Sequence, residues 1–276
     1  DRYLFNRFEL ESKERGHGYG DEQQNVHPAE LEPELRELAL SLEDVDAGRL
    51  ERFVDGPIEL KDRVTLHDPI DELRMVLAKD ASYQKMAKHL LSQRDPDFFT
   101  VYFQGVDIAS HYFWKYLFPE EWEERYPDSP IPDEEIERYR NVIPEYYRLM
   151  DEYMADLLEQ AGEDTLVMVL SDHGFVTGRR KKGSGRARET VSGTHAKSAP
   201  PGVLIVSGQG AAAGGSSTQA SVLDIVPTVL TAMGLPVARD MDGRVLLSAL
   251  DESAFEHPLP VDWVESYEKP EDIAHK

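Results

Sequence analysis

Five side chains that bind metal ions well lie close to the ends of apolar segments in this 276-residue chain. They are two aspartates and three histidines: Asp107, His111, Asp172, His173 and His195. Asp107 and His111 are four positions apart, a spacing that puts two side chains on one face of a helix. The chain has no cysteine, so a thiolate site is excluded. Imidazole nitrogen with carboxylate oxygen suits catalytic zinc or, less specifically, manganese or another divalent ion.

The number of these candidate ligands predicts a centre of two ions. Five ligands are too many for one catalytic zinc, which keeps a coordination position open, and too few for two complete sites. We therefore expect two divalent metal ions, with some ligands supplied from elsewhere.

Each part of this set also has a purely structural interpretation. Asp172 and His173 could form a simple turn at the end of a strand, and Asp107 and His111 could be a helix N-terminal acid and a surface histidine. His195 lies in a loop rich in serine and glycine and alone would carry no assignment. The metal interpretation depends on all five residues falling near successive predicted strand ends.

The order of helical and extended patterns predicts an α/β fold. Short apolar runs rich in β-branched or aromatic residues predict strands at residues 97–105, 164–172 and 202–208. Strands that are apolar on both faces favour a mainly parallel sheet covered by helices on both faces. In open α/β sheets, ligands bind beyond the carboxyl ends of the strands, which is where most of the five residues are expected.

The helices between these strands are predicted from apolar periodicity and from capping residues. Leucines at three-to-four spacing follow Pro28, and Asp68 with Pro69 predicts the start of a helix that continues to Gln93. Further helices are expected at residues 106–117, 134–160 and 216–235. Pro227 is expected to bend the last of these.

The charge of the chain restricts its partners. It has 53 acidic and 30 basic residues, a net charge of -23, which disfavours nucleic acid and anionic membrane surfaces because the long-range field repels them. A phosphate substrate would need local positive charge from metal ions or basic side chains. Six basic residues within Arg179–Arg188 could supply it as a glycine-hinged flap, or could belong to a solvated loop.

No apolar run approaches the roughly 20 residues that cross a bilayer, and no secretory signal pattern is present. The compartment is therefore undetermined, with the cytoplasm favoured as an expectation.

Several motifs of the chain together resemble the alkaline phosphatase superfamily, specifically its type I phosphodiesterase/nucleotide pyrophosphatase branch. In chain order they are "YFQGVDIASHYFW", "VLSDHGF", "GTH" followed by "GVLIVSGQG", and "SVLDIVPTVLTAMGLPVARDMDGRVL". The resemblance covers about residues 95–247. It implies an alkaline phosphatase-like partial domain, made of a helical cap or insertion segment at 1–94, the C-terminal part of the metal-binding core at 95–250, and a tail at 251–276.

The resemblance also implies a two-metal phosphohydrolase that cleaves phosphodiester or pyrophosphate bonds. It assigns Asp107, His111 and His195 to one ion, and Asp172 with His173 to the other. Zinc is the expected metal, with manganese as the alternative. The expected substrate is a phosphorylated small molecule such as a nucleotide, and the oligomeric state is open.

In the family, a Thr or Ser nucleophile and a further aspartate ligand lie in an N-terminal part that has no counterpart in these residues. The resemblance thus leads us to expect a nucleophile outside this chain and little activity of the chain alone. Alternatives are another superfamily member, such as a phosphomutase, sulfatase or phosphoethanolamine transferase, or a non-catalytic metal-binding relative.

Overall fold

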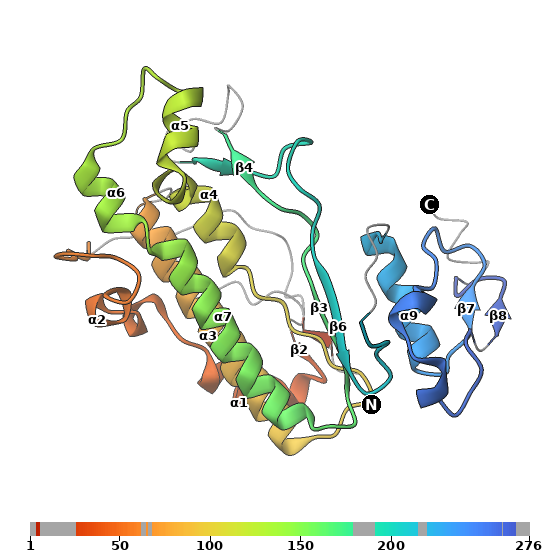
Figure 1. Ribbon diagram of the computed structural model, residues 1–276. Coiled ribbons are helices and arrows are strands. Elements are labelled where there is room, and N and C mark those ends of the chain that lie inside the picture. The colour runs from red at the N-terminus through yellow and green to blue at the C-terminus, as the bar shows by residue number, and fades with distance from the viewer. Residues whose placement is uncertain are drawn as a thin grey trace. The chain divides into compact units, whose positions relative to one another are not determined.

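The computed structural model describes most of the chain (Figure 1). The described residues are 4–5, 26–61, 65, 68–178, 191–214, 220–260 and 262–268. The basic segment Arg179–Arg188, for which a flap and a solvated loop were the two interpretations, lies outside them.

The chain forms two compact units, which are described separately. Unit 1 consists of Asp1–Gln160 and Phe175–Ala199, and unit 2 consists of Ala161–Gly174 and Pro200–Lys276. These units are defined by compactness, whereas the segments 1–94, 95–250 and 251–276 were inferred from sequence motifs. The segment boundaries remain a prediction.

Unit 1 is mainly helical. Its described helices are α1 (Glu32–Leu38), α2 (Ala47–Leu50), α3 (Pro69–Gln93), α4 (Gly105–Leu117), α5 (Pro119–Arg125), α6 (Asp133–Tyr139) and α7 (Val142–Ala161, whose last residue belongs to unit 2), with 3-10 turns at Ala29–Leu31 and Leu42–Asp44. Unit 1 also contains two short antiparallel strand pairs: β1 (Leu4–Phe5) with β2 (Val26–His27), and β4 (Val176–Thr177) with β5 (Gly193–Thr194). The main core packs around α3, α4 and α7.

The start of α3 confirms the predicted capping signal. The Asp68 side chain accepts hydrogen bonds from the backbone N–H groups of Ile70 and Asp71, and Pro69 is the first helical residue. These contacts satisfy backbone donors that a helix start leaves without intrahelical partners. The helix ends at Gln93, as predicted.

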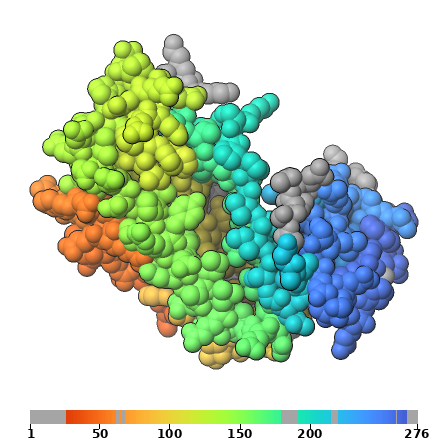
Figure 2. Space-filling view, in the orientation of Figure 1, coloured from red at the N-terminus to blue at the C-terminus, as the bar shows by residue number. Residues whose placement is uncertain are grey.

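One long helix was predicted over residues 134–160, but the structure contains two, α6 and α7. Pro144 lies in the first turn of α7, where its missing N–H costs nothing. In the interior of a longer helix, Pro144 could not donate the backbone hydrogen bond to the carbonyl four residues earlier. A new helix therefore starts just before Pro144. Figure 2 shows α7 on the surface of unit 1, and its buried residues, Val142, Ile143 and Tyr146, are at its N-terminal end.

Asp80 is a fully buried carboxylate in the middle of α3. It accepts hydrogen bonds from the backbone N–H groups of Gln104 (3.0 Å) and Gly105 (2.8 Å) and from the Tyr146 hydroxyl (3.0 Å). Burial raises the pKa of Asp80 from 3.8 to about 6, although these hydrogen bonds act in the opposite direction.

This raised pKa predicts a pH dependence of stability. Because the folded-state pKa lies above the unfolded-state value, the contribution of Asp80 is present below about pH 4 and is lost as pH rises through about 6. At about 1.4 kcal/mol per pKa unit, the shift from 3.8 to about 6 corresponds to a loss on the order of 3 kcal/mol in the free energy of unfolding. Urea unfolding of the parent and Asp80→Asn from pH 4 to 7 should show the parent losing stability relative to the variant. Parallel profiles would contradict the assignment.

The strand predicted at residues 97–105 is wrong. Residues 99–104 belong to no strand, and α4 begins at Gly105. Apolar, β-branched composition indicates an extended and packed segment, but a strand also needs a hydrogen-bonded partner, which composition does not report.

Unit 2 contains the two other predicted strands. β3 (Leu166–Leu170) pairs with β6 (Leu204–Gly208), with Leu166 opposite Gly208 and Leu170 opposite Leu204. This pairing is antiparallel, so the predicted parallel direction is wrong for these strands; only the short pair β7 (Val237–Ala238) and β8 (Trp263–Val264) is parallel in the described part of unit 2. A continuous apolar run does not report the direction of the neighbouring strand, and β3 and β6 are half-buried to exposed and not buried on both faces. The α/β class itself is confirmed.

The predicted closing helix of unit 2 is α9 (Ile225–Ala232), preceded by a 3-10 turn at Val222–Asp224. Pro227 lies in its first turn and therefore does not bend it. Gly234 ends it with a φ of 70°, and Leu235 N–H donates to the Leu230 carbonyl. Two further 3-10 turns lie at Leu247–Ala249 and Glu252–Ala254. Among the described helices of both units, none is long and apolar enough to cross a membrane.

Candidate metal centre

Asp107 and His111 lie on one face of α4, one helical turn apart. The Asp107 Oδ2 and His111 Nε2 atoms are 3.7 Å apart, and the two side chains are 28% and 14% exposed. This distance is too long for a hydrogen bond. The predicted pairing by helical spacing is therefore present, with both potential ligand atoms on the same side of the helix.

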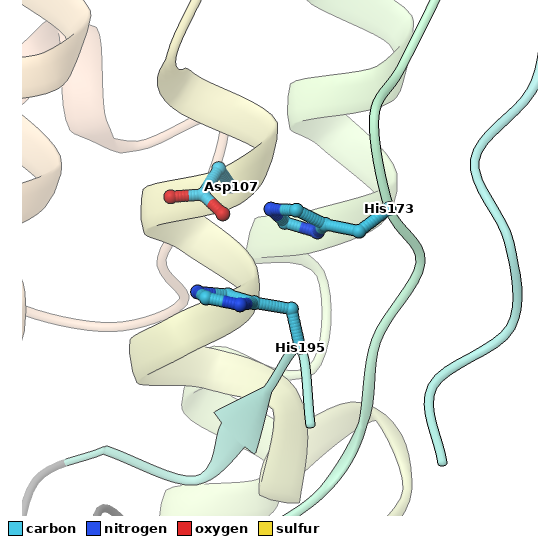
Figure 3. Close-up of side chains that lie close together, drawn as sticks. All are labelled: Asp107, His173 and His195. Carbon is cyan, nitrogen blue, oxygen red and sulfur yellow. The ribbon is translucent and has the colours of Figure 1, made fainter. Parts of the chain in front are cut away.

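His195 belongs to the same cluster in unit 1, where it follows β5. The ring centroids of His111 and His195 are 5.3 Å apart and the ring planes meet at 68°. A carboxylate oxygen of Asp107 and a ring nitrogen of His195 lie within 4.8 Å of each other. Figure 3 shows Asp107 and His195 close together, one on α4 and the other at the end of β5.

The segment before His195 is held tightly against α4. Ser192 is fully buried; its N–H donates to the His111 carbonyl (2.8 Å), and its hydroxyl oxygen accepts from the Lys115 N–H (3.2 Å). Gly193 follows, and a Cβ at this position would lie 2.3 Å from the Ser110 carbonyl oxygen. Only glycine permits this approach of the two backbones.

A backbone hydrogen bond sets the tautomer of His111. Its Nδ1–H donates to the Gly193 carbonyl at 2.8 Å, so the proton resides on Nδ1 and the lone pair on Nε2 can face Asp107. Histidines that bind metals usually donate their other ring N–H to a carbonyl or carboxylate in this way. The backbone of Gly193 therefore orients His111 for coordination through Nε2.

The donor types of Asp107, His111 and His195, one carboxylate and two imidazoles, suit a divalent cation. Zinc bonds of about 2.0–2.1 Å at tetrahedral angles put ligand atoms about 3.3–3.4 Å apart, close to the 3.7 Å between Asp107 Oδ2 and His111 Nε2. One carboxylate and two imidazoles also form a common ligand set of catalytic zinc. The Phe175 ring packs edge-on against both histidine rings, with centroids 5.0 and 6.1 Å away, and forms an apolar wall.

Asp172 and His173 lie together in unit 2, just after β3. The Asp172 Oδ1 and His173 Nε2 atoms are 3.7 Å apart, and the Asp172 side chain is 74% exposed. Figure 3 also labels His173. Three of the five predicted ligands therefore belong to unit 1 and two belong to unit 2.

The turn that carries Asp172 and His173 is built against residues 200–203. Gly174 N–H donates to the Pro200 carbonyl, and Ser171 N–H donates to the Val203 carbonyl, both within 2.9 Å. A Cβ on Gly174 would lie 2.9 Å from the Pro200 oxygen. Glycine at this position therefore permits the close approach of the two backbones.

Sequence reasoning assigned His195 but missed Ser192 and Gly193, which hold its segment against α4. The available signal was the short motif Ser-Gly immediately before Thr-His. A small polar residue and a glycine just before a candidate ligand indicate that the backbone approaches another element closely.

The model of one protein family matches residues 20–206 of this chain, and its description is type I phosphodiesterase / nucleotide pyrophosphatase. The match includes all five predicted ligands and most of the helical segment before them. Neither a curated protein nor a solved structure matches the chain.

Proposed function

The chain belongs to the type I phosphodiesterase / nucleotide pyrophosphatase family, and from this membership we propose that it serves in the metal-dependent hydrolysis of phosphodiester or pyrophosphate bonds. The observation that supports this most strongly is the orientation of His111. Its Nδ1–H is committed to the Gly193 carbonyl, while Nε2 faces the Asp107 carboxylate. A solvated surface histidine would not need a buried, glycine-dependent partner of this kind.

In this proposal, Asp107, His111 and His195 hold one divalent ion, with zinc preferred over manganese. Bound ions of this kind activate a hydroxyl nucleophile and neutralise charge on the phosphoryl oxygens. The nucleophile is not assigned to a residue of this chain. The role of these side chains is to fix the ion, and the Phe175 ring packs edge-on against both histidine rings.

Asp172 and His173 are proposed to hold a second ion. We assign the pair as ligands from the sequence and from family membership.

The proposed substrate is a phosphorylated small molecule, with nucleotides as the leading class. The net charge of -23 repels such anions, so binding must depend on local cations. Calorimetric titration with AMP in the presence of zinc and after chelation tests this. Binding that requires zinc is expected. Equal AMP binding with and without zinc, or failure of the protein to take up zinc, would refute the proposal.

Asp172→Ala is expected to lower the metal content from two zinc ions per chain to one. Removing the exposed Asp172 carboxylate leaves His173 as the single proposed ligand of the second ion, while the unit 1 residues are unchanged. Elemental analysis after equilibration with zinc measures the stoichiometry. Asp164→Ala, which removes an exposed acid before β3, is the matched control. Two ions retained in Asp172→Ala would exclude Asp172 as a ligand of the second ion.

A further inference from the structure

The first turn of α4, which carries Asp107, is held from outside the helix by two other helices. As described above, Asp80 of α3 accepts the N–H groups of Gln104 and Gly105, and Tyr146 of α7 donates its hydroxyl to the same carboxylate. Lys79 adds a second contact from α3, because its Nζ donates to Gln104 Oε1 at 2.8 Å. The backbone groups bonded in this way are among those that a helix start leaves without intrahelical partners.

The middle of α4, at His111, is held by separate contacts. The His111 carbonyl accepts the N–H of Ser192, and His111 Nδ1 donates to Gly193. The α4 helix is therefore fixed at its start by Asp80 and at its centre by the segment that leads to His195. Asp107 lies between these two points, two residues after Gly105.

We propose that Asp80 and Tyr146 are positioning residues of the metal centre, which set the place of Asp107 relative to His111 and His195 by anchoring the start of α4. This inference rests on the proposed metal-dependent function. Asp80 acts through the backbone of residues 104 and 105, and Tyr146 acts through Asp80.

The chemistry of the Asp80 site supports a role beyond general packing. Burying a carboxylate is costly even with three hydrogen bonds, and burial accordingly raises the pKa of Asp80. An apolar side chain would pack into α3 at lower cost but would leave two N–H groups of α4 without an acceptor. The carboxylate is the group that can accept both N–H groups and the Tyr146 hydroxyl at once.

α3 offers a matched control for this proposal. Asp71 is a second buried aspartate on the same helix, 2% exposed, and its carboxylate accepts the Thr65 N–H and pairs with Arg74. Asp71→Asn therefore disturbs a buried carboxylate of α3 without touching residues 104 and 105. A purely structural role of Asp80 predicts that the two Asp→Asn variants behave alike.

Zinc titration of the full chain, by competition with a chelating dye, separates the two outcomes. Asp80→Asn is expected to weaken zinc binding about tenfold, the scale of losses from outer contacts of metal ligands, whereas Asp71→Asn should bind like the parent. Hydrogen exchange of the α4 amides, measured without metal, should rise near residue 107 in Asp80→Asn only. Tyr146→Phe keeps the ring and removes only the hydroxyl. If Asp80→Asn does not fold, the zinc affinity of Tyr146→Phe tests the positioning role instead.

Zinc affinity in Asp80→Asn and Tyr146→Phe equal to that of Asp71→Asn would overturn the positioning role while leaving the metal centre intact. If the parent binds no zinc, or if His111→Ala binds it as tightly as the parent, the proposed function fails and the positioning role falls with it.

Discussion

Replacement of His111 by alanine is expected to weaken zinc binding at the unit 1 centre by more than about 100-fold. Loss of an outer hydrogen-bond partner already costs about 10- to 100-fold in metal affinity, and loss of a direct ligand costs more. His111 is also the ligand whose orientation is fixed in the most detail, through the Gly193 carbonyl. Competition with a chelating dye measures the change directly.

The matched control is His89→Ala. His89 is a partly buried histidine of α3 that pairs with Glu34 and has no part in the proposed centre. Asp107→Asn, which keeps the shape of the ligand and removes its charge, should resemble His111→Ala in zinc affinity. If His111→Ala and His89→Ala bind zinc equally well, the assignment of this cluster as a metal centre is wrong.

Much of the candidate site could be predicted from local sequence patterns. The spacing of Asp107 and His111 determines that they share a helix face, because helical geometry depends only on residues three to four positions apart. Asp68 with Pro69 identified the start of α3 for the same reason. A capping signal and an i,i+4 pair are complete within one turn of the chain.

The features that escaped prediction depend on residues distant in sequence. Asp80 falls on the buried side of α3, among Leu73, Leu77 and other apolar residues, and its acceptor role becomes visible only with residues 104 and 105 beside it. The pairing of β3 with β6 is similar. Apolar runs identified both strands, but their antiparallel direction depends on how the chain returns between them.

Gly105 is a case in which the sequence signal was real and its cause was misassigned. It was taken to end a strand, whereas it is the first residue of α4. A Cβ on Gly105 would lie 1.8–2.0 Å from three atoms of the Tyr146 side chain. Tyr146 is itself fully buried and donates to Asp80, so its ring has no alternative place to occupy.

Gly105→Ala is therefore expected to lower the free energy of unfolding by about 3 kcal/mol or more, at the upper end of the range for overpacked cores. Urea unfolding followed by circular dichroism measures this change. In a helix, alanine is otherwise favoured over glycine, so the sign of the effect distinguishes the steric clash from intrinsic propensity. Gly48→Ala in α2 is the control, because its nearest contact would be at 3.4 Å, and it should be neutral or stabilising.

A double-mutant cycle with Tyr146→Leu tests the cause of this loss. If the Tyr146 ring is the obstacle, Gly105→Ala should cost clearly less in the Tyr146→Leu background, and the two substitutions should show a coupling energy of at least about 1 kcal/mol. Simple additivity would mean that Gly105 is required by the backbone and not by the ring. Because Asp107 lies two residues further along α4, the same cycle measured by zinc affinity reports how far a displaced helix start disturbs the metal centre.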